Sequence, residues 1–224
     1  MIAGLPSALA RAVAQLPERR LRGPLVATLV WTVLAFVPVW LGALYAVRRV
    51  AERFGGYGML AEIGAVVLLA LATWLAFAVI ENTILLQYTD RIIAAVEARH
   101  YPALAPAGRA RWRDTLPSGL WLLAVTVLGN LVLLPLYLVL PGMNLVLFLG
   151  LNGYVLGRGY FDAVTLRRMD GRAARLLWRA HRAAFIVNGA LAAFLLTVPG
   201  LNLVAPIVGL AATVHLIEGR RSAP

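Results

Sequence analysis

The sequence contains no cysteine and no lysine, and it has few charged residues of either sign. The absence of cysteine excludes disulfides, thiol chemistry and cysteine-ligated metals. Charged residues make up 14% of the 224 positions and hydrophobic residues 61%, whereas about a quarter of a soluble domain is charged. All 21 basic residues are arginine, and the net charge is +11. The arginines lie between long uncharged runs, which favours contact with anionic lipids over binding of nucleic acid.

Motifs that carry catalysis are also missing. The sequence shows no nucleophile–base set, no phosphate-binding glycine loop and no zinc signature. His215 and Glu218 are three residues apart, but a metal site needs more ligands than these two. We therefore predict that the chain is not an enzyme and that it binds no cofactor and no metal.

Four long runs without charge determine the predicted fold class. They cover 23–47, 63–80, 115–157 and 183–217. A helix needs about 20 apolar residues to cross the hydrocarbon core of a bilayer. We expect an all-α integral membrane protein with a single membrane domain, 1–224. No cleavable signal peptide is expected, because the first 22 residues are mixed and basic and the run after them is too long for a signal sequence.

The expected domain has four parts. An amphipathic segment covers 1–22, two long transmembrane helices cover 23–113, a first hairpin with a basic interfacial helix covers 114–182, and a second hairpin with the tail covers 183–224. Apolar residues recur at helical spacing in the first part, which predicts a helix over 5–22 at the membrane interface. These residues are Leu5, Leu9, Ala12, Val13 and Leu16.

The segment 158–182 carries the densest group of arginines. Arg172, Arg175, Arg179 and Arg182 share one helical face there. The pattern predicts a basic interfacial helix, whose face either contacts lipid headgroups or forms an anion-collecting surface. Arg158 and Asp162 are four residues apart on a predicted helix, so we expect a local ion pair between them.

The phrase Pro-Gly-x-Asn-Leu-Val occurs twice, and each copy divides a long uncharged run. Pro141-Gly142 and Pro199-Gly200 each predict a type II turn, which requires a positive φ at the glycine. Asn144 and Asn202 then fall where an N-cap would open the next helix.

The arms around these turns decide how deep the hairpins reach. The second copy leaves arms of about 16 and 17 residues, or about 24–26 Å, which is short of the roughly 30 Å core. We expect two re-entrant or short spanning hairpins. Their buried helix starts would either attract an anion through the helix dipole or only satisfy free backbone N–H groups.

The distribution of arginine predicts the topology. If two helices cross and both hairpins return, 18 arginines lie on one side and only Arg48, Arg49 and Arg53 on the other. Cytoplasmic segments carry the excess of positive charge, so both termini are expected in the cytoplasm. The same count would result from six full spans.

The order of these features resembles a known family, the CysZ-type sulfate permeases and their relatives, the etoposide-induced-protein family. The resemblance covers nearly the whole chain, and its most specific part is VPGLNLVAPIVGLAATVHL at 198–216. Other matching segments are AQLPERRLRGPL at 14–25, VEARHYP at 96–102, LPGMN at 140–144 and GYFD at 159–162.

The resemblance implies an inner-membrane permease for sulfate or a related oxyanion that assembles as a homo-oligomer. It implies an anion site at Arg19 and Arg20, before the first long helix. The family has a glycine where this sequence has Pro17-Glu18. A glycine lets backbone N–H groups approach an anion closely, whereas Glu18 adds a negative charge. The alternative function is a non-transporting membrane scaffold or remodelling protein whose hairpins insert into one leaflet.

Overall fold

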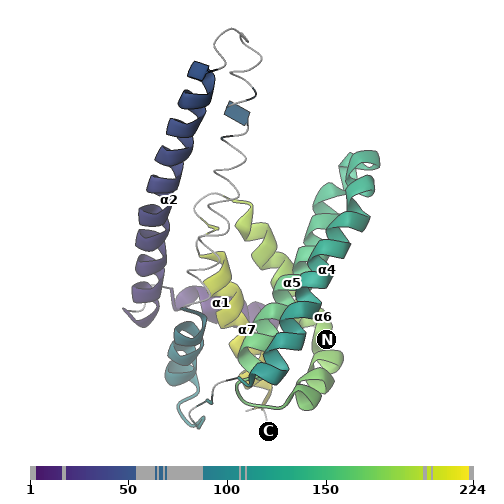
Figure 1. Ribbon diagram of the computed structural model, residues 1–224. Coiled ribbons are helices and arrows are strands. Elements are labelled where there is room, and N and C mark those ends of the chain that lie inside the picture. The colour runs from purple at the N-terminus through teal and green to yellow at the C-terminus, as the bar shows by residue number, and fades with distance from the viewer. Residues whose placement is uncertain are drawn as a thin grey trace. The chain divides into compact units, whose positions relative to one another are not determined.

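The computed structural model describes residues 4–16, 19–53, 88–105, 107–108, 110–198, 201–202 and 204–221, together with four isolated residues between 64 and 69. All regular structure in this part of the chain is helical, so the all-α prediction is confirmed (Figure 1). The helices are α1 (Leu5–Ala14), α2 (Arg19–Arg53), α4 (Trp112–Val139), the 3₁₀ turn η1 (Pro141–Met143), α5 (Asn144–Thr165), α6 (Gly171–Leu196) and α7 (Ala205–Arg221). Residues 88–100 are also helical.

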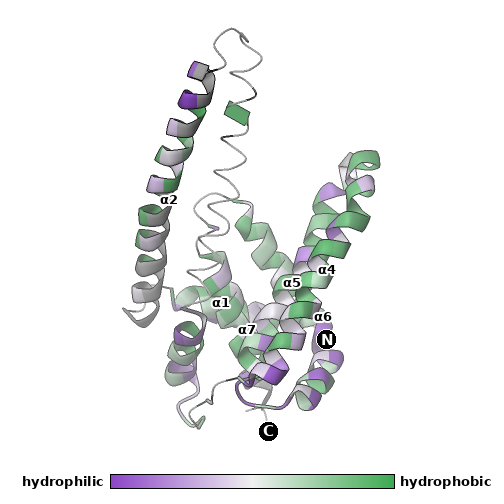
Figure 2. Ribbon diagram, viewed as in Figure 1, coloured by the Kyte–Doolittle hydropathy of each residue, from purple (hydrophilic) through white to green (hydrophobic). Residues whose placement is uncertain are grey.

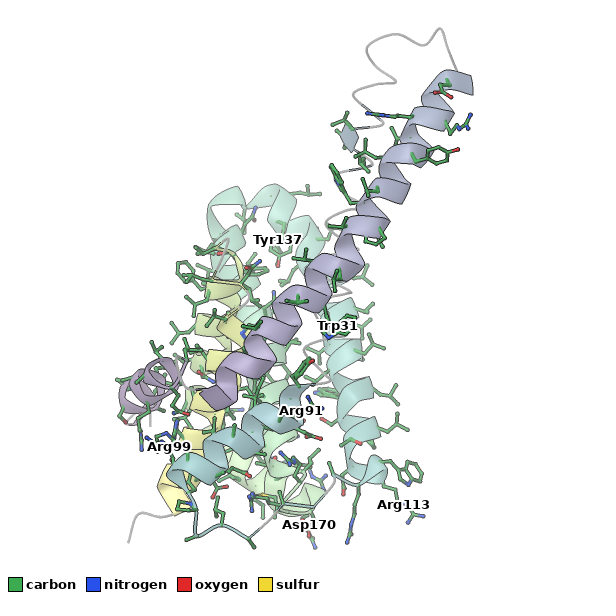
Figure 3. All side chains as sticks on the ribbon, turned by 90° about the vertical axis from the view of Figure 1, so that its left-hand side faces the viewer. Trp31, Arg91, Arg99, Arg113, Tyr137 and Asp170 are labelled. Atoms are coloured by element: carbon green, nitrogen blue, oxygen red, sulfur yellow. The ribbon has the colours of Figure 1, made fainter. Side chains whose placement is uncertain are left out.

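The chain divides into two compact units, Gly23–Tyr88 and Met1–Arg22 with Thr89–Pro224. The smaller unit contains most of α2, a helix of 35 residues and about 52 Å, which includes the predicted span 23–47. Most of its described apolar side chains, such as Trp31 (labelled in Figure 3) and Leu34, are exposed. Most of the second predicted span, 63–80, lies outside the described residues.

The larger unit has its core around α7. Ala205–Glu218 is buried along its whole length, as expected for a helix that is apolar on all sides. α7 packs against α1, α5 and α6. Its 17 residues begin four positions after the start of the predicted second arm, 201–217, and extend past its end to Arg221.

The N-terminal helix ends earlier than the predicted segment 5–22, and its buried face agrees with the prediction at Leu5 and Ala12 but not at Val13. α1 ends at Ala14, and it covers α7 with a stripe that includes Leu5, Ala8 and Ala12. Val13, predicted to belong to the apolar face, is 53% exposed. The smaller alanines allow a close approach of α1 to α7, and this contact determines which face of α1 is buried.

The first Pro-Gly motif reverses the chain between α4 and α5, but not by the predicted turn. Residues Pro141–Met143 form a 3₁₀ turn closed by Met143 N–H donating to Leu140 O at 2.9 Å. Among the described residues only Gly4 has a positive φ, so the type II prediction at Gly142 is wrong. A 3₁₀ turn keeps all its residues near helical φ and therefore does not require glycine.

The 3₁₀ turn also shifts the position of Asn144. Met143 occupies the N-cap of α5 without a side-chain hydrogen bond, and Asn144 is the first helical residue. With its amide nitrogen turned toward α4, Asn144 donates to Leu140 O and Tyr137 O, both at 3.2 Å. Its side chain therefore satisfies the C-terminal carbonyls of α4 and does not cap α5.

The variant Gly142→Ala is consequently expected to fold with unchanged or slightly higher stability. A Cβ at Gly142 meets nothing within 4 Å, and alanine lowers the entropy of the unfolded chain, a gain of about 0.4–1 kcal/mol. Thermal unfolding in detergent measures the difference from wild type. A clear loss of stability would show that the turn needs the glycine conformation.

The second Pro-Gly motif is described only in part. Pro199 and Gly200 lie outside the described residues. Asn202 N–H donates to Val198 O at 3.1 Å, and α7 begins three residues later, at Ala205. The structure therefore does not place Asn202 at the N-cap of α7.

The predicted basic helix 158–182 is not one helix. Its residues are divided between the end of α5, the turn 166–170 and the first part of α6. α5 ends at Thr165, and Asp170 begins the second helix, because its side chain caps α6 by accepting a 2.7 Å hydrogen bond from Ala173 N–H. The arginines of α6 do share one helix, which continues without a break into the first arm of the second hairpin.

Candidate functional site

Close contact between α5 and α6 positions the most charged region of the larger unit. The two backbones approach through Gly153, Gly157 and Gly189, where an added Cβ would contact main-chain atoms of the other helix. Next to this contact, the rings of Phe161, Trp178 and Phe185 lie 4.8–5.8 Å apart, centroid to centroid. This rigid aromatic wall fixes the side chains that project from it.

Arg158 is held against this wall by a buried carboxylate. Its Nε donates to Asp162 Oδ2 at 2.8 Å, and the two side chains are 15% and 7% exposed. The expected ion pair is thus confirmed. Ser118 Oγ on α4 donates to the same Asp162 oxygen. The Arg158 guanidinium carbon lies 4.9 Å from the centroid of the Trp178 ring, a distance typical of a cation–π contact.

These residues border a cavity of about 440 Å³, which we call the basic pocket. α4, α5, the turn after α5 and α6 line it with Arg113, Asp114, Pro117, Ser118, Trp121, Tyr154, Arg158, Leu166, Gly171, Arg175, Trp178 and Arg179. Polar residues gather at this end of α4 and α6, while α4 is apolar along the rest of its length (Figure 2). Figure 3 shows Arg113 and Asp170 at the same end.

The basic pocket has an excess of positive charge. Its four arginines face two carboxylates, Asp114 in the lining and Asp162 on Arg158, which leaves two positive charges. Arg175 and Arg179 form no ion pair with any carboxylate in the described part of the chain. A cavity with unpaired guanidinium groups can hold an anion through paired N–H donors.

A second polar cluster joins α1 to α7. Gln15 Nε2 donates to Arg11 O at 2.8 Å and lies 2.6 Å from His215 Nε2. Because an amide nitrogen only donates, His215 accepts at Nε2 and its Nδ1–H donates to Tyr101 Oη, 3.0 Å away. Burial raises the pKa of the Tyr101 phenol, an effect that Arg11 opposes. The cluster holds two helices together by neutral hydrogen bonds.

A buried ion pair connects the helical segment 88–100 to the turn between α5 and α6. Arg168 Nε and Nη2 donate to the two oxygens of Glu97 at 2.9 and 2.7 Å, and Nη1 donates to Ala105 O at 2.8 Å. The hydrogen bonds to Glu97 raise the pKa of Arg168 above its usual value. The side chains are 11% and 9% exposed. This pair fixes the turn that carries the pocket residue Leu166.

The residues predicted to gather the anion and the residues predicted to open buried helices lie on different elements. Arg19 and Arg20 are the first residues of α2, and their side chains lie outside the described part. Asn144 begins α5, while Arg158 lies 14 residues further along the same helix, or about 21 Å. The basic pocket was missed because its arginines come from three helices, although the shared face of Arg175 and Arg179 had indicated an anion-collecting surface. The described residues contain no group of three or more metal-ligating side chains.

Comparison with protein-family models gives a match over most of the chain. A family model described as sulfate transporter CysZ/etoposide-induced protein 2.4 matches residues 8–206. The matched range covers both Pro-Gly motifs and every residue of the basic pocket. No curated protein matches the chain.

Proposed function

Because the chain belongs to the sulfate transporter CysZ/etoposide-induced protein 2.4 family, we propose that it is an inner-membrane permease that moves sulfate or a related oxyanion into the cytoplasm. The family match over residues 8–206 is the observation that carries this proposal. Members of this family are membrane-associated transporters rather than enzymes, and the excess of arginine suits an anionic substrate. We also propose that the chain contacts anionic lipids and assembles with other copies of itself.

The apolar surface of α4 supports a membrane location. Among the described residues, α4 is the one helix long and apolar enough to cross a bilayer, and none of its apolar window is buried. Leu123, Leu128 and Val132 are each at least 60% exposed. Exposing such a surface to water costs roughly 25 cal/mol per Å² of apolar area. Contact with lipid chains avoids this cost.

We propose that the first hairpin is re-entrant and that both termini are cytoplasmic. Only 14 residues of α5, 144–157, precede Arg158, and they reach about 21 Å against a core of roughly 30 Å. With Arg158 at the cytoplasmic interface, an upright hairpin would therefore turn inside the hydrocarbon. The excess of arginine in the segments assigned to the cytoplasm supports this orientation.

The topology is tested by introducing single cysteines into this cysteine-free chain. Gly142→Cys is expected to resist an impermeant maleimide added from the periplasmic side, because the turn lies within the bilayer. Gly56→Cys, in the predicted outer segment 48–58, serves as the positive control and is expected to react fully. Labelling of Gly142→Cys to the same extent as the control would establish a spanning hairpin.

Arg19 and Arg20 are the proposed residues that gather the anion. Radiolabelled sulfate uptake into proteoliposomes is expected to fall at least about tenfold in Arg19→Ala/Arg20→Ala, since hydrogen bonds to charged groups contribute roughly 1.5–3 kcal/mol each and 1.4 kcal/mol is tenfold in affinity. The matched control Arg48→Ala/Arg49→Ala removes the same charge on the opposite side and is expected to retain uptake. If Arg19→Ala/Arg20→Ala takes up sulfate as fast as Arg48→Ala/Arg49→Ala does, Arg19 and Arg20 do not gather the anion.

Glu18 distinguishes the permease from the alternative of a membrane scaffold. This carboxylate stands where the family has glycine, and it repels an anion at Arg19 and Arg20. In a permease, Glu18→Gly is expected to increase a sulfate uptake that the wild type already shows. Sulfate binding that appears only in Glu18→Gly would favour the scaffold.

A further inference from the structure

We propose that the basic pocket binds a tetrahedral oxyanion, at a site separate from Arg19 and Arg20. The bound group is either free sulfate or the phosphate of a lipid headgroup, because both present the same tetrahedral oxygens to arginine. This inference depends on the proposed function in one respect only, which is that the free anion is sulfate. The pocket itself follows from its volume, charge and donors.

Arg158 provides a fixed donor. Asp162 occupies its Nε, and the Trp178 ring lies against its plane. Its two terminal nitrogens donate to no protein atom in the described part of the chain. A guanidinium that is held at Nε and packed on an aromatic ring loses little side-chain entropy when a ligand binds its remaining N–H groups.

Arg175 and Arg179 provide two adjustable donors one helical turn apart on α6. Both side chains are exposed and line the cavity. At Gly171, the first residue of α6, an added Cβ would lie 3.0 Å from Asp114 Oδ1 and 3.4 Å from Arg175 Nη1. The glycine therefore leaves the space in which these side chains move, and Arg113 lines the same cavity from α4.

The electrostatics of the pocket favour an anion. Two positive charges remain after Asp114 and Asp162 are counted against the four arginines. Trp121, Trp178 and Leu166 form apolar walls, beside which an anion interacts more strongly with the arginines than it does in bulk water. The volume of about 440 Å³ holds a hydrated sulfate or a phosphate with part of its glycerol.

Calorimetry with the full chain in neutral detergent tests the site. Sodium sulfate is titrated at constant ionic strength against sodium chloride, in the background Arg19→Ala/Arg20→Ala. Sulfate binding is expected to persist in this background and to weaken at least about tenfold on adding Arg175→Gln/Arg179→Gln. The matched control Arg172→Gln/Arg182→Gln removes the same charge from the same helix at exposed positions outside the pocket, and less than about a twofold change is expected.

A lipid headgroup as the ligand gives a different result. Native mass spectrometry after reconstitution with phosphatidylglycerol then shows one fewer retained lipid in Arg175→Gln/Arg179→Gln than in the Arg172→Gln/Arg182→Gln control, and sulfate competes with that lipid. Free sulfate as the ligand leaves lipid retention equal in both variants. If neither sulfate affinity nor lipid retention differs between the two variants, the pocket is not an oxyanion site.

These outcomes are separable from a failure of the proposed function. If sulfate binding depends on Arg175 and Arg179 but the protein transports no sulfate, the pocket is an oxyanion site and the proposed permease function is wrong. If the protein transports sulfate but Arg175→Gln/Arg179→Gln binds sulfate and lipid as the control variant does, the permease function stands and the pocket is not an oxyanion site.

Discussion

Replacing Gly189 with alanine is expected to destabilise the protein by about 3 kcal/mol or more, at or above the upper end of the usual 1–3 kcal/mol cost of overpacking. A Cβ at this position would contact Gly153 O and Gly157 N directly and lie 2.8 Å from Gly157 Cα. All three atoms belong to the backbone of α5, so no rotamer change can relieve the contact. The two helices must separate, which also moves Trp178 and Arg158 at the basic pocket.

Gly150→Ala is the matched control on α5. A Cβ there meets nothing within 4 Å, and alanine is favoured over glycine in a helix by about 1 kcal/mol. Denaturant titration in detergent should therefore show a large loss of stability for Gly189→Ala and none for Gly150→Ala. Equal stability of the two variants would contradict the close packing of α5 on α6.

The second large effect is expected for Glu97→Gln, at about 3–5 kcal/mol of lost stability. Removing one partner of a buried ion pair leaves the other charge uncompensated, which typically costs that amount. Arg168 would keep its 2.8 Å hydrogen bond to Ala105 O, but the amide that replaces the carboxylate offers one neutral acceptor oxygen in place of the bidentate, charged partner. The turn 166–170 would then lose its attachment to the helical segment 88–100.

Asp90→Asn serves as the control because it removes a carboxylate from the same helical segment. Asp90 lies 3.6 Å from Arg167 Nε but is 75% exposed, and exposed ion pairs contribute about 0–1 kcal/mol. Thermal unfolding should separate the two variants clearly. A loss in Glu97→Gln no larger than in Asp90→Asn would show that the Arg168 pair does not stabilise the fold.

The sequence predicted the helical class and the first reversal of the chain because both depend on local signals. Long uncharged runs predict apolar helices, and Pro141-Gly142 marks the reversal after α4. The type of turn was wrong, because the choice between a type II and a 3₁₀ turn depends on how α4 and α5 pack. The same packing directs the side chain of Asn144 to the C-terminal carbonyls of α4, to which it donates hydrogen bonds.

Charged contacts between distant segments could not be predicted in this way. Arg158 and Asp162 are four residues apart, and helical periodicity alone brings them together. The partners Glu97 and Arg168 are separated by 71 residues, and only the tertiary fold joins them. The basic pocket is of the second kind, because Arg113 reaches it from α4 and Arg175 from α6.

The most direct measurement of anion transport by this chain is the uptake of radiolabelled sulfate by liposomes that contain the purified wild-type protein. The permease predicts that sulfate enters these vesicles faster than protein-free vesicles, in proportion to the protein reconstituted, and that excess unlabelled sulfate slows the entry of label more than chloride does. Uptake equal to that of protein-free vesicles, at every protein density and with the protein shown to be folded and inserted, would contradict the proposal.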